Sequence, residues 1–299
     1  MSHMAKQRWQ SIASPSTVFA LSPVTEDSWV LGTNEGVWKF VNGVCSITAD
    51  ALRPAAITAV AATVALPMYT LLLAGAADGI ARSVDGGQTW ATAQMIKPVQ
   101  VTQLLISNTF QGDSFAVAAT MQDGVLCSAD HGLSWQGYNI GMLDHETTAI
   151  ALSPHLNTDE TVFVATVTGL YRSTNFGRAW RDVPLPPGAA PLSSLTFSGD
   201  VLVAGSENQG LLYTQDMGVS WARRNSYKSG PVSVVATSPD GLTLALATPA
   251  VVAVSKDQGK TWLRAEGHVP ANIISLGVGN DALVLVGTQE EGLWIYGAG

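Results

Sequence analysis

The chain of 299 residues is 46% hydrophobic and 13% charged, so it has enough apolar side chains for a large core and is not intrinsically disordered. Its formal net charge of −8 at pH 7 argues against non-specific binding to nucleic acid or to an anionic membrane surface. The longest apolar stretch, residues 55–77, is interrupted by Pro67, and we therefore expect two strands there and no transmembrane span.

The N-terminus lacks a basic segment followed by an apolar one, so no secretory signal is recognised and a cytoplasmic location is expected. Residues 1–7 are treated as a separate N-terminal stretch, because Ser2-His3-Met4 is typical of an expression-vector remnant. If such a remnant replaced a native leader, an extracytoplasmic location is the alternative.

Short β-branched and apolar runs, separated by Gly, Pro, Asn and Asp, recur along the chain, and no convincing helix is predicted. Two series of such runs have seven members each, which predicts seven repeated units of β-structure. Runs of the first series begin each unit and span residues 18–23, 57–63, 101–107, 148–154, 193–199, 232–239 and 273–279. Runs of the second series contain a short loop, followed by Gly in all but one of them, and span residues 30–38, 73–81, 118–126, 164–171, 203–212, 245–253 (the run without Gly) and 286–294.

An eight-residue corner closed by Trp follows in five of the units. The corners read SVDGGQTW (83–90), SADHGLSW (128–135), STNFGRAW (173–180), TQDMGVSW (214–221) and SKDQGKTW (255–262). Their Trp residues are 45, 45, 41 and 41 positions apart, a period typical of a four-stranded unit.

Each corner residue type has an expected structural role. The Asp or Asn accepts hydrogen bonds from backbone N–H groups of its own turn, the Gly adopts a positive φ, and the Trp is buried against a neighbouring layer. The alternative is that the acids bind a metal or a substrate, but equivalent corners of separate units would not bring them to one site. The predicted structural residues are Ser83, Asp85, Gly87, Trp90, Ser128, Asp130, Gly132, Trp135, Ser173, Asn175, Gly177, Trp180, Thr214, Asp216, Gly218, Trp221, Ser255, Asp257, Gly259 and Trp262.

The two end units depart from this pattern. The first has an Asn42-Gly43 turn in place of a corner, and the last stops after its third strand. Residues 8–14 are similar to the segment that follows a corner, with Trp9 in the position of the anchoring Trp. We therefore expect an N-terminal strand to complete the last unit. The predicted fold is all-β: one seven-bladed β-propeller domain of four-stranded antiparallel blades, residues 8–297.

The corner pattern S/T-x-D/N-x-G-x-x-W resembles the Asp-box, or BNR repeat, of sialidases, xyloglucanases, sortilin-type receptors and photosystem II stability/assembly factors. The resemblance covers nearly the whole chain and implies a structural corner between the third and fourth strands of a blade. It does not imply a sialidase, because the early F/Y-R-I-P segment and its arginine context are absent. Xyloglucanases pair two such propellers, whereas this chain holds one. The acidic charge departs from the basic arginine patch of the assembly factors.

Neither Cys45 nor Cys127 lies in a zinc-binding pattern, and no motif for another cofactor is present, so no metal or cofactor is predicted. The two cysteines fall in different strand-like segments, and we expect two reduced, half-buried thiols.

The resemblance implies that the turns between second and third strands share one face with the connections between blades, around the mouth of a central channel. Two features stand out there. Asp144-His145-Glu146 places an imidazole between two carboxylates, a combination suited to acid or base chemistry. The basic, aromatic loop 222–230 suits a carboxylate or phosphate. Solvated surface charge is the simpler explanation of both. The candidate binding residues are Glu35, Arg53, Asp78, Asp123, Tyr138, Asp144, His145, Glu146, Glu207, Arg223, Arg224, Tyr227, Lys228 and His268.

The predicted function is a non-enzymatic binding or assembly scaffold that presents these loops to a protein partner. The alternative is a carbohydrate-active or other small-molecule enzyme that uses acids at the channel mouth and takes a glycan as its ligand. No catalytic residue is assigned.

Overall fold

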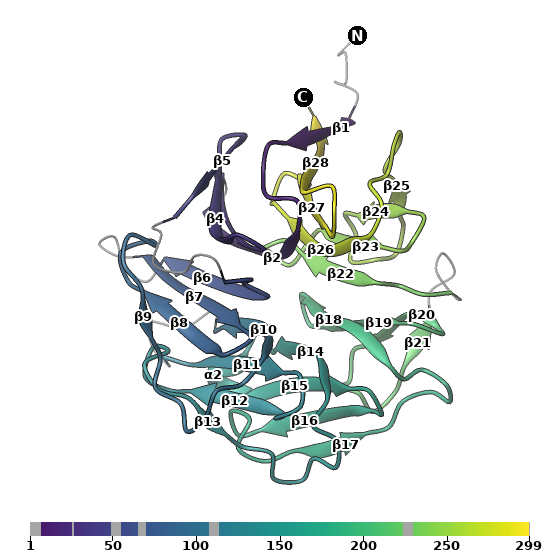
Figure 1. Ribbon diagram of the computed structural model, residues 1–299. Helices are drawn as coiled ribbons and strands as arrows, with labels where there is room; N and C mark the ends of the chain where they lie inside the picture. The colour runs from purple at the N-terminus through teal and green to yellow at the C-terminus, as the bar shows by residue number, and fades with distance from the viewer. Residues whose placement is uncertain are drawn as a thin grey trace.

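The computed structural model describes residues 7–25, 27–48, 55–64, 70–107, 114–223 and 230–298. Its strands form seven four-stranded antiparallel sheets, arranged as a ring around a central axis (Figure 1). In six sheets, four consecutive strands pair in chain order from the centre outward. The predicted seven-bladed propeller is therefore confirmed.

The first three blades follow the two predicted series of runs. Blade 1 contains β2 (Val18–Thr25), β3 (Ser28–Thr33), β4 (Gly36–Val41) and β5 (Val44–Ile47). Blade 2 contains β6 (Ala59–Val64), β7 (Thr70–Ala76), β8 (Gly79–Ser83) and β9 (Ala91–Thr92). Blade 3 contains β10 (Val101–Ile106), β11 (Ala116–Thr120), β12 (Val125–Ser128) and β13 (Gln136–Gly137).

The remaining blades continue in the same direction around the ring. Blade 4 contains β14 (Thr147–Leu152), β15 (Thr161–Thr166), β16 (Leu170–Thr174) and β17 (Arg181–Val183). Blade 5 contains β18 (Leu192–Ser198), β19 (Val201–Ser206), β20 (Gly210–Thr214) and β21 (Ala222–Arg223). Blade 6 contains β22 (Val234–Thr237), β23 (Leu244–Ala247), β24 (Val252–Ser255) and β25 (Leu263–Arg264). Blade 7 contains β26 (Ile273–Val278), β27 (Val284–Thr288), β28 (Leu293–Ala298) and β1 (Gln7–Ile12).

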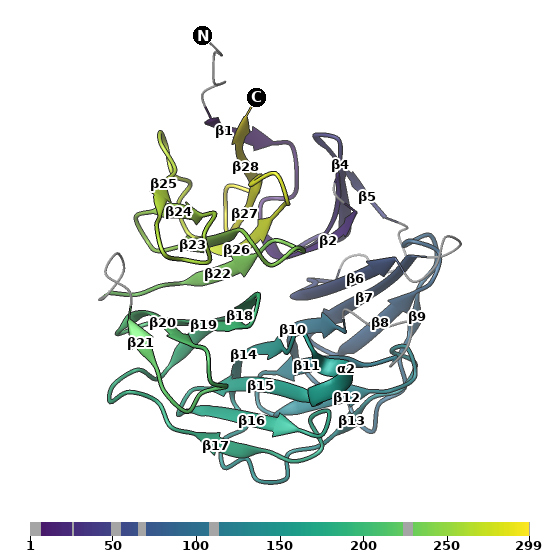
Figure 2. The same cartoon turned by 180° about the vertical axis from the view of Figure 1, so that it is seen from behind.

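The described residues include one short helix, α2 (Leu156–Asp159), which was not expected from the sequence (Figure 2). It forms a single turn between β14 and β15. The Ser153 hydroxyl donates to the Asp159 carboxylate at 2.6 Å, and the Leu156 side chain is fully buried beneath the loop. Local hydrogen bonds and one apolar contact thus stabilise a turn too short to show a helical sequence period. The described residues include no helix long and apolar enough to span a bilayer.

The N-terminal strand completes blade 7, as predicted. β1 pairs with β28 along its whole length, from Gln7 opposite Ala298 to Ile12 opposite Leu293. The Trp9 ring lies 5.0 Å from the Tyr296 ring, centroid to centroid. Figure 1 accordingly shows β1 and β28 side by side in one blade. The ring is closed by pairing the first strand of the sequence with the last.

The blades hold together through buried faces. Each corner Trp packs against the preceding blade, so that Trp135 contacts a core with Leu73 and Ile80 of blade 2, and Trp180 packs with Val117 of blade 3. The predicted burial is confirmed for Trp135 and Trp180, whereas Trp90, Trp221 and Trp262 are only half-buried against the preceding blade. Removing such a ring from water contributes roughly 4–6 kcal/mol as an upper estimate from buried area.

Among the described strands, the innermost one of each blade has no partner on its channel side. At five of the interfaces between blades, a polar side chain of one blade instead bonds to the inner-strand backbone of the next. These bonds are Ala62 N–H to Ser22 Oγ (3.0 Å), Thr58 Oγ1 to Val101 O (2.6 Å), Ile150 N–H to Gln103 Oε1 (2.8 Å), Val235 N–H to Ser194 Oγ (3.0 Å) and Ser275 Oγ to Val18 O (2.9 Å).

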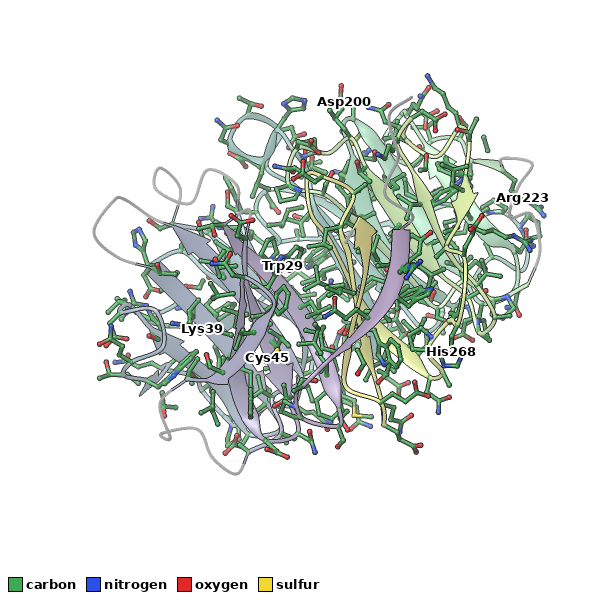
Figure 3. All side chains as sticks on the ribbon, turned by 90° about the horizontal axis from the view of Figure 1, so that it is seen from above. Trp29, Lys39, Cys45, Asp200, Arg223 and His268 are labelled. Carbon is green, nitrogen blue, oxygen red and sulfur yellow. The ribbon has the colours of Figure 1, made fainter. Side chains whose placement is uncertain are left out.

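The loops of the ring alternate between two faces. The corners and the loops between first and second strands form what we call the corner face. The turns between second and third strands and the connections between blades form the connection face. In the edge-on view of Figure 3, Asp200, between β18 and β19, lies on one side of the disc, and His268, between β25 and β26, lies on the other.

Both cysteines are free, as expected. Cys45 is half-buried, and burial raises the pKa of its thiol to about 11. Cys127 is more deeply buried than expected, and burial raises the pKa of its thiol to about 12. Both thiols are therefore protonated and weakly nucleophilic near neutral pH.

Deleting residues 1–14 removes β1 and exposes the edge of β28. We expect the melting temperature to fall by roughly 10 °C or more, since each kcal/mol lost shifts Tm by about 2–4 °C in a domain of this size class. Differential scanning calorimetry of the full and shortened chains measures this. An unchanged melting temperature would show that blade 7 does not need its fourth strand.

Replacing Trp135 with Ala should lower the free energy of unfolding by about 3–5 kcal/mol, because the ring is only 2% exposed and its removal leaves a cavity between blades 2 and 3. Leu133→Ala is the matched control, because this exposed side chain belongs to the same corner. Its effect should stay within about 0.5 kcal/mol. Denaturant titration of both variants is the measurement, and equal effects would contradict the proposed anchoring role.

Candidate functional site

The acids of the repeated corners are bonded within their own turns. At the blade 2 corner, the Ser83 hydroxyl donates to Asp85 Oδ1 at 2.7 Å and accepts from Gly87 N–H at 2.8 Å. Backbone N–H groups of Gln88 and Thr89 also donate to Asp85 Oδ1, both at 2.9 Å. The corners around Asp130, Asp216 and Asp257 repeat the bonds from the leading hydroxyl and from the N–H four residues later. The carboxylates of these Asp residues therefore accept the hydrogen bonds that stabilise the corners.

The blade 4 corner has Asn175 in place of Asp and shows a compensating change. In each Asp corner, the residue four positions later is Ser or Thr, and its hydroxyl donates to the second carboxylate oxygen. The distances are 2.5 Å for Thr89, Ser134 and Ser220, and 2.6 Å for Thr261. An amide has no second oxygen to accept this bond. Ala179 stands at that position in the Asn corner, where its N–H donates to Asn175 Oδ1 at 3.0 Å.

These bonds favour the ionised carboxylates. The Ser220 hydroxyl and N–H lower the pKa of Asp216 from 3.8 to about 2, and the same groups of Thr261 lower the pKa of Asp257 to about 2. The Thr89 hydroxyl and N–H hold the pKa of Asp85 well below its usual range. Burial alone would raise the pKa of Asp130, but bonds from Ser134 and Ser128 outweigh it and lower the pKa.

Nine of the ten described candidate residues lie on the turns and connections expected from the sequence, whereas Arg223, expected in the loop 222–230, lies in outer strand β21. Seven side chains are exposed, and those of Asp123, Tyr138 and Asp144 are half-buried. Arg53, Arg224, Tyr227 and Lys228 lie outside the described residues, so most of the basic loop 222–230 stays a prediction. The exposed candidates are Glu35, Asp78, His145, Glu146, Glu207, Arg223 and His268.

The Asp144-His145-Glu146 segment is bonded to both neighbouring turns. Asp144 Oδ2 accepts from the Thr168 N–H at 3.0 Å and from its hydroxyl at 2.8 Å. The His145 carbonyl accepts from Gly124 N–H at 3.0 Å, and the Glu146 carbonyl accepts from Val167 N–H at 3.1 Å. Burial opposes ionisation of Asp144, but bonds from Glu146 N–H and Thr168 outweigh it and lower its pKa. The segment thus joins the turns of blades 3 and 4, and the Asp144 carboxylate forms part of this hydrogen-bonded connection.

The other candidates do not converge on one point. Tyr138 lines a hollow of about 280 Å³ with Phe115, Phe176 and Arg178, between blade 3 and the corner of blade 4. The His268 ring lies beside Trp294, with centroids 5.9 Å apart. Figure 3 shows Arg223 at the outer rim of blade 5, well away from His268. Among the described residues, no group of three or more His, Cys, Asp or Glu side chains is arranged to hold a metal.

The central channel is a cavity of about 660 Å³, lined by the first strands of all seven blades. Apolar and hydroxyl-bearing side chains make up nearly all of its wall, and Gln103 is its one amide. Within the described part of the chain, no charged side chain lines the channel, and none of the candidate residues does so. The acids of the connection face therefore surround the channel on loops outside its wall.

Sequence reasoning missed a set of exposed apolar side chains on the connections and turns of blades 2 to 4. They lie on the loops that follow β9 and β13 and on the turns after β11 and β15, all between residues 96 and 167. The exposed fractions are 91% for Ile96, 50% for Met121, 71% for Ile140, 95% for Leu143 and 44% for Val167. The other large apolar side chains that are exposed in the described chain are spread over the corner side of five blades: Val41, Val44, Val84, Leu133, Val219, Leu242 and Leu263.

Hydrogen bonds join these loops into one series, which we call the connection belt (residues 96–100, 121–124, 139–146 and 167–168). Met121 N–H donates to the Gln100 carbonyl at 2.9 Å, and Lys97 forms an ion pair with Asp123. Asn139 donates to the Asp123 carbonyl at 2.8 Å. The bonds of residues 144–146 extend the series to blade 4. The belt is therefore a bonded surface from which apolar side chains project into solvent.

No family model matches the chain, and no curated protein matches its sequence. Solved structures match its fold over nearly its whole length. YCF48 bound to a D1 peptide aligns with a TM-score of 0.75 at 13% identity, covering 100% of this chain and 96% of that one. YCF48 from Cyanidioschyzon merolae gives 0.71 at 15%, covering 96% and 98%. The GH74 xyloglucanase from Xanthomonas campestris gives 0.71 at 18%, covering 97% of this chain and 53% of the enzyme. These likenesses confirm the expected resemblance as one of fold.

The corner acids should make the stability of the protein fall in acid. Asp216 and Asp257 have pKa values near 2 when folded and near 3.8 otherwise, so they favour folding above about pH 4. That contribution disappears as the pH falls from about 4 to 2, because the unfolded chain then takes up protons first. The variant Asp216→Asn/Ser220→Ala/Asp257→Asn/Thr261→Ala rebuilds both corners in the Asn175-Ala179 form. Its free energy of unfolding, measured by urea titration, should fall less steeply over this pH range. Parallel curves for the two proteins would rule out the corner acids as the cause.

Proposed function

We propose that the chain is a non-enzymatic binding scaffold whose connection belt binds a protein segment carrying large apolar side chains and at least one basic residue. The observation that carries the proposal is the set of five exposed apolar side chains on hydrogen-bonded loops of adjacent blades. Single exposed apolar residues are ordinary on a protein surface, but a cluster on one side is typical of an interaction site.

The belt is suited to binding because its backbone is already held in place. Ordering flexible loops opposes association, and loops fixed beforehand avoid part of that cost. Ile96 and Leu143 are almost fully exposed, so each can gain about 1.5–3 kcal/mol when a partner covers it. The two side chains are the expected anchors.

The charges of the belt favour a basic partner. Lys97 is paired with Asp123, which leaves Asp144 and Glu146 as acids without a cation among their described contacts. The whole chain has a formal charge of −8, so long-range attraction also favours a cationic segment. The fold itself is compatible with peptide binding, since YCF48 with a bound D1 peptide has the same architecture.

The alternative, carbohydrate processing at the channel mouth, has less support. Glycoside hydrolysis ordinarily uses two carboxyl groups about 5–10 Å apart on either side of the scissile bond. The described channel wall carries no carboxylate, and the Asp144 carboxylate already accepts a hydrogen bond from the Thr168 hydroxyl. An acid pair would have to come from the exposed loops around the mouth.

The test compares affinity capture from native lysate with binding to a glycan array. The wild-type chain should enrich a protein partner, and Ile96→Ser/Leu143→Ser should lose it, with a roughly 100-fold weaker Kd when the partner is titrated. Val219→Ser/Leu263→Ser is the matched control, because it makes the same change at exposed positions outside the belt. It should bind as the wild type does.

Binding to glycans with no protein enriched would overturn the proposal. So would equal capture by the belt variant and its control. Thermal melts of both variants show whether a loss of capture reflects unfolding, which is not expected at exposed positions.

A further inference from the structure

The central channel has properties that the proposed scaffold role does not use. Its volume of about 660 Å³ lies within the range of small-molecule sites, which are commonly about 300–1,000 Å³ and mainly apolar with a few polar groups. Half-buried apolar side chains such as Leu105, Phe197 and Val234 line it from separate blades.

One ring of channel hydroxyl groups lies where the first strands begin, at the connection face, while Ser22, Ser153 and Thr237 carry others farther along or directly after these strands. Seven equivalent residues stand there, each at the bulge of its strand or directly before the strand, and five of the seven carry a hydroxyl. They are Phe19, Thr58, Thr102, Thr148, Ser193, Ser233 and Ile274. The hydroxyls of Thr58 and Ser193 bond to neighbouring blades, whereas the Thr102 side chain is exposed within the channel. The two apolar members belong to adjacent blades 7 and 1.

We propose that this channel binds an uncharged small molecule with a largely apolar body, whose hydrogen-bonding end lies at the hydroxyl-bearing mouth. A charged ligand is disfavoured, because no described side chain of the wall could compensate a buried charge. The apolar wall supplies contact area, and Thr102 supplies a donor and an acceptor at the mouth. This site is separate from the connection belt, since no belt residue lines the channel.

The test uses prodan, an uncharged naphthalene ketone whose emission shifts to the blue in an apolar site. The wild-type chain should bind one prodan saturably and bind the anionic dye 1-anilinonaphthalene-8-sulfonate at least tenfold more weakly. Thr102→Trp fills the channel and should weaken prodan binding at least tenfold. Thr92→Trp, the same change at an exposed position of outer strand β9, should leave it unchanged.

A second variant keeps the test decisive if Thr102→Trp fails to fold. Thr102→Lys places a cation at the mouth and should reverse the preference toward the anionic dye. The belt variant Ile96→Ser/Leu143→Ser should bind prodan as the wild type does. The proposal is overturned if prodan does not bind saturably within its solubility, if both Thr102 variants bind it unchanged, or if the belt variant loses it. Loss of prodan binding by the belt variant would mean that the dye binds the connection belt and not the channel. If only partner capture fails, the proposed function is overturned but the channel proposal is not.

Discussion

Every blade of this protein depends on having a neighbour on both of its faces. Second strands such as β15 and β19 are buried at every position, so the apolar side chains on both faces of a blade must be covered by neighbouring blades. The ring must therefore close, and the pairing of β1 with β28 achieves this within blade 7. The inner edges remain open toward the channel, where Ser22, Gln103 and Ser194 bond to the backbone of the following blade. Apolar burial thus holds the blades together, and these polar contacts set how they align.

Repetition makes departures from the repeat informative. The Asn175 corner keeps its shape because Ala179 removes a hydroxyl that would have lost its acceptor, so this departure is structural. The connection belt has no such compensation, since its apolar side chains occur on blades 2 to 4 without equivalents on the other described connections. The ring of hydroxyls at the channel mouth is likewise broken at Phe19 and Ile274. Seven units that serve only stability would need neither the apolar side chains confined to blades 2 to 4 nor the interruption of the hydroxyl ring. Both departures from the repeat are therefore interpreted as features for binding.

The period of the Trp residues and the two series of strand runs were enough to predict seven blades, and the similarity of residues 8–14 to the segment after a corner predicted the N-terminal closure. Burial in the loops could not be predicted in the same way. Met142 and Leu143 are adjacent apolar residues, yet Met142 is buried and Leu143 is 95% exposed, because contacts between loops of different blades decide which side faces solvent. Asp144 was interpreted as a candidate for acid or base chemistry for the same reason: its partner, Thr168, lies in another blade. The turn α2 was missed because its stabilising bonds are local and few.

The β1 and β28 pair also determines how the molecule responds to mechanical load. The two strands run antiparallel, and Gln7 lies opposite Ala298, so both chain ends leave the ring at the same end of the pair. A force that pulls the ends apart acts on one pair of backbone hydrogen bonds at a time and peels the strands open in sequence. A fold held together by buried interfaces between its blades is thereby weak under tension at this seam. Once the seam opens, blade 7 loses its outer strand and the ring can unravel blade by blade.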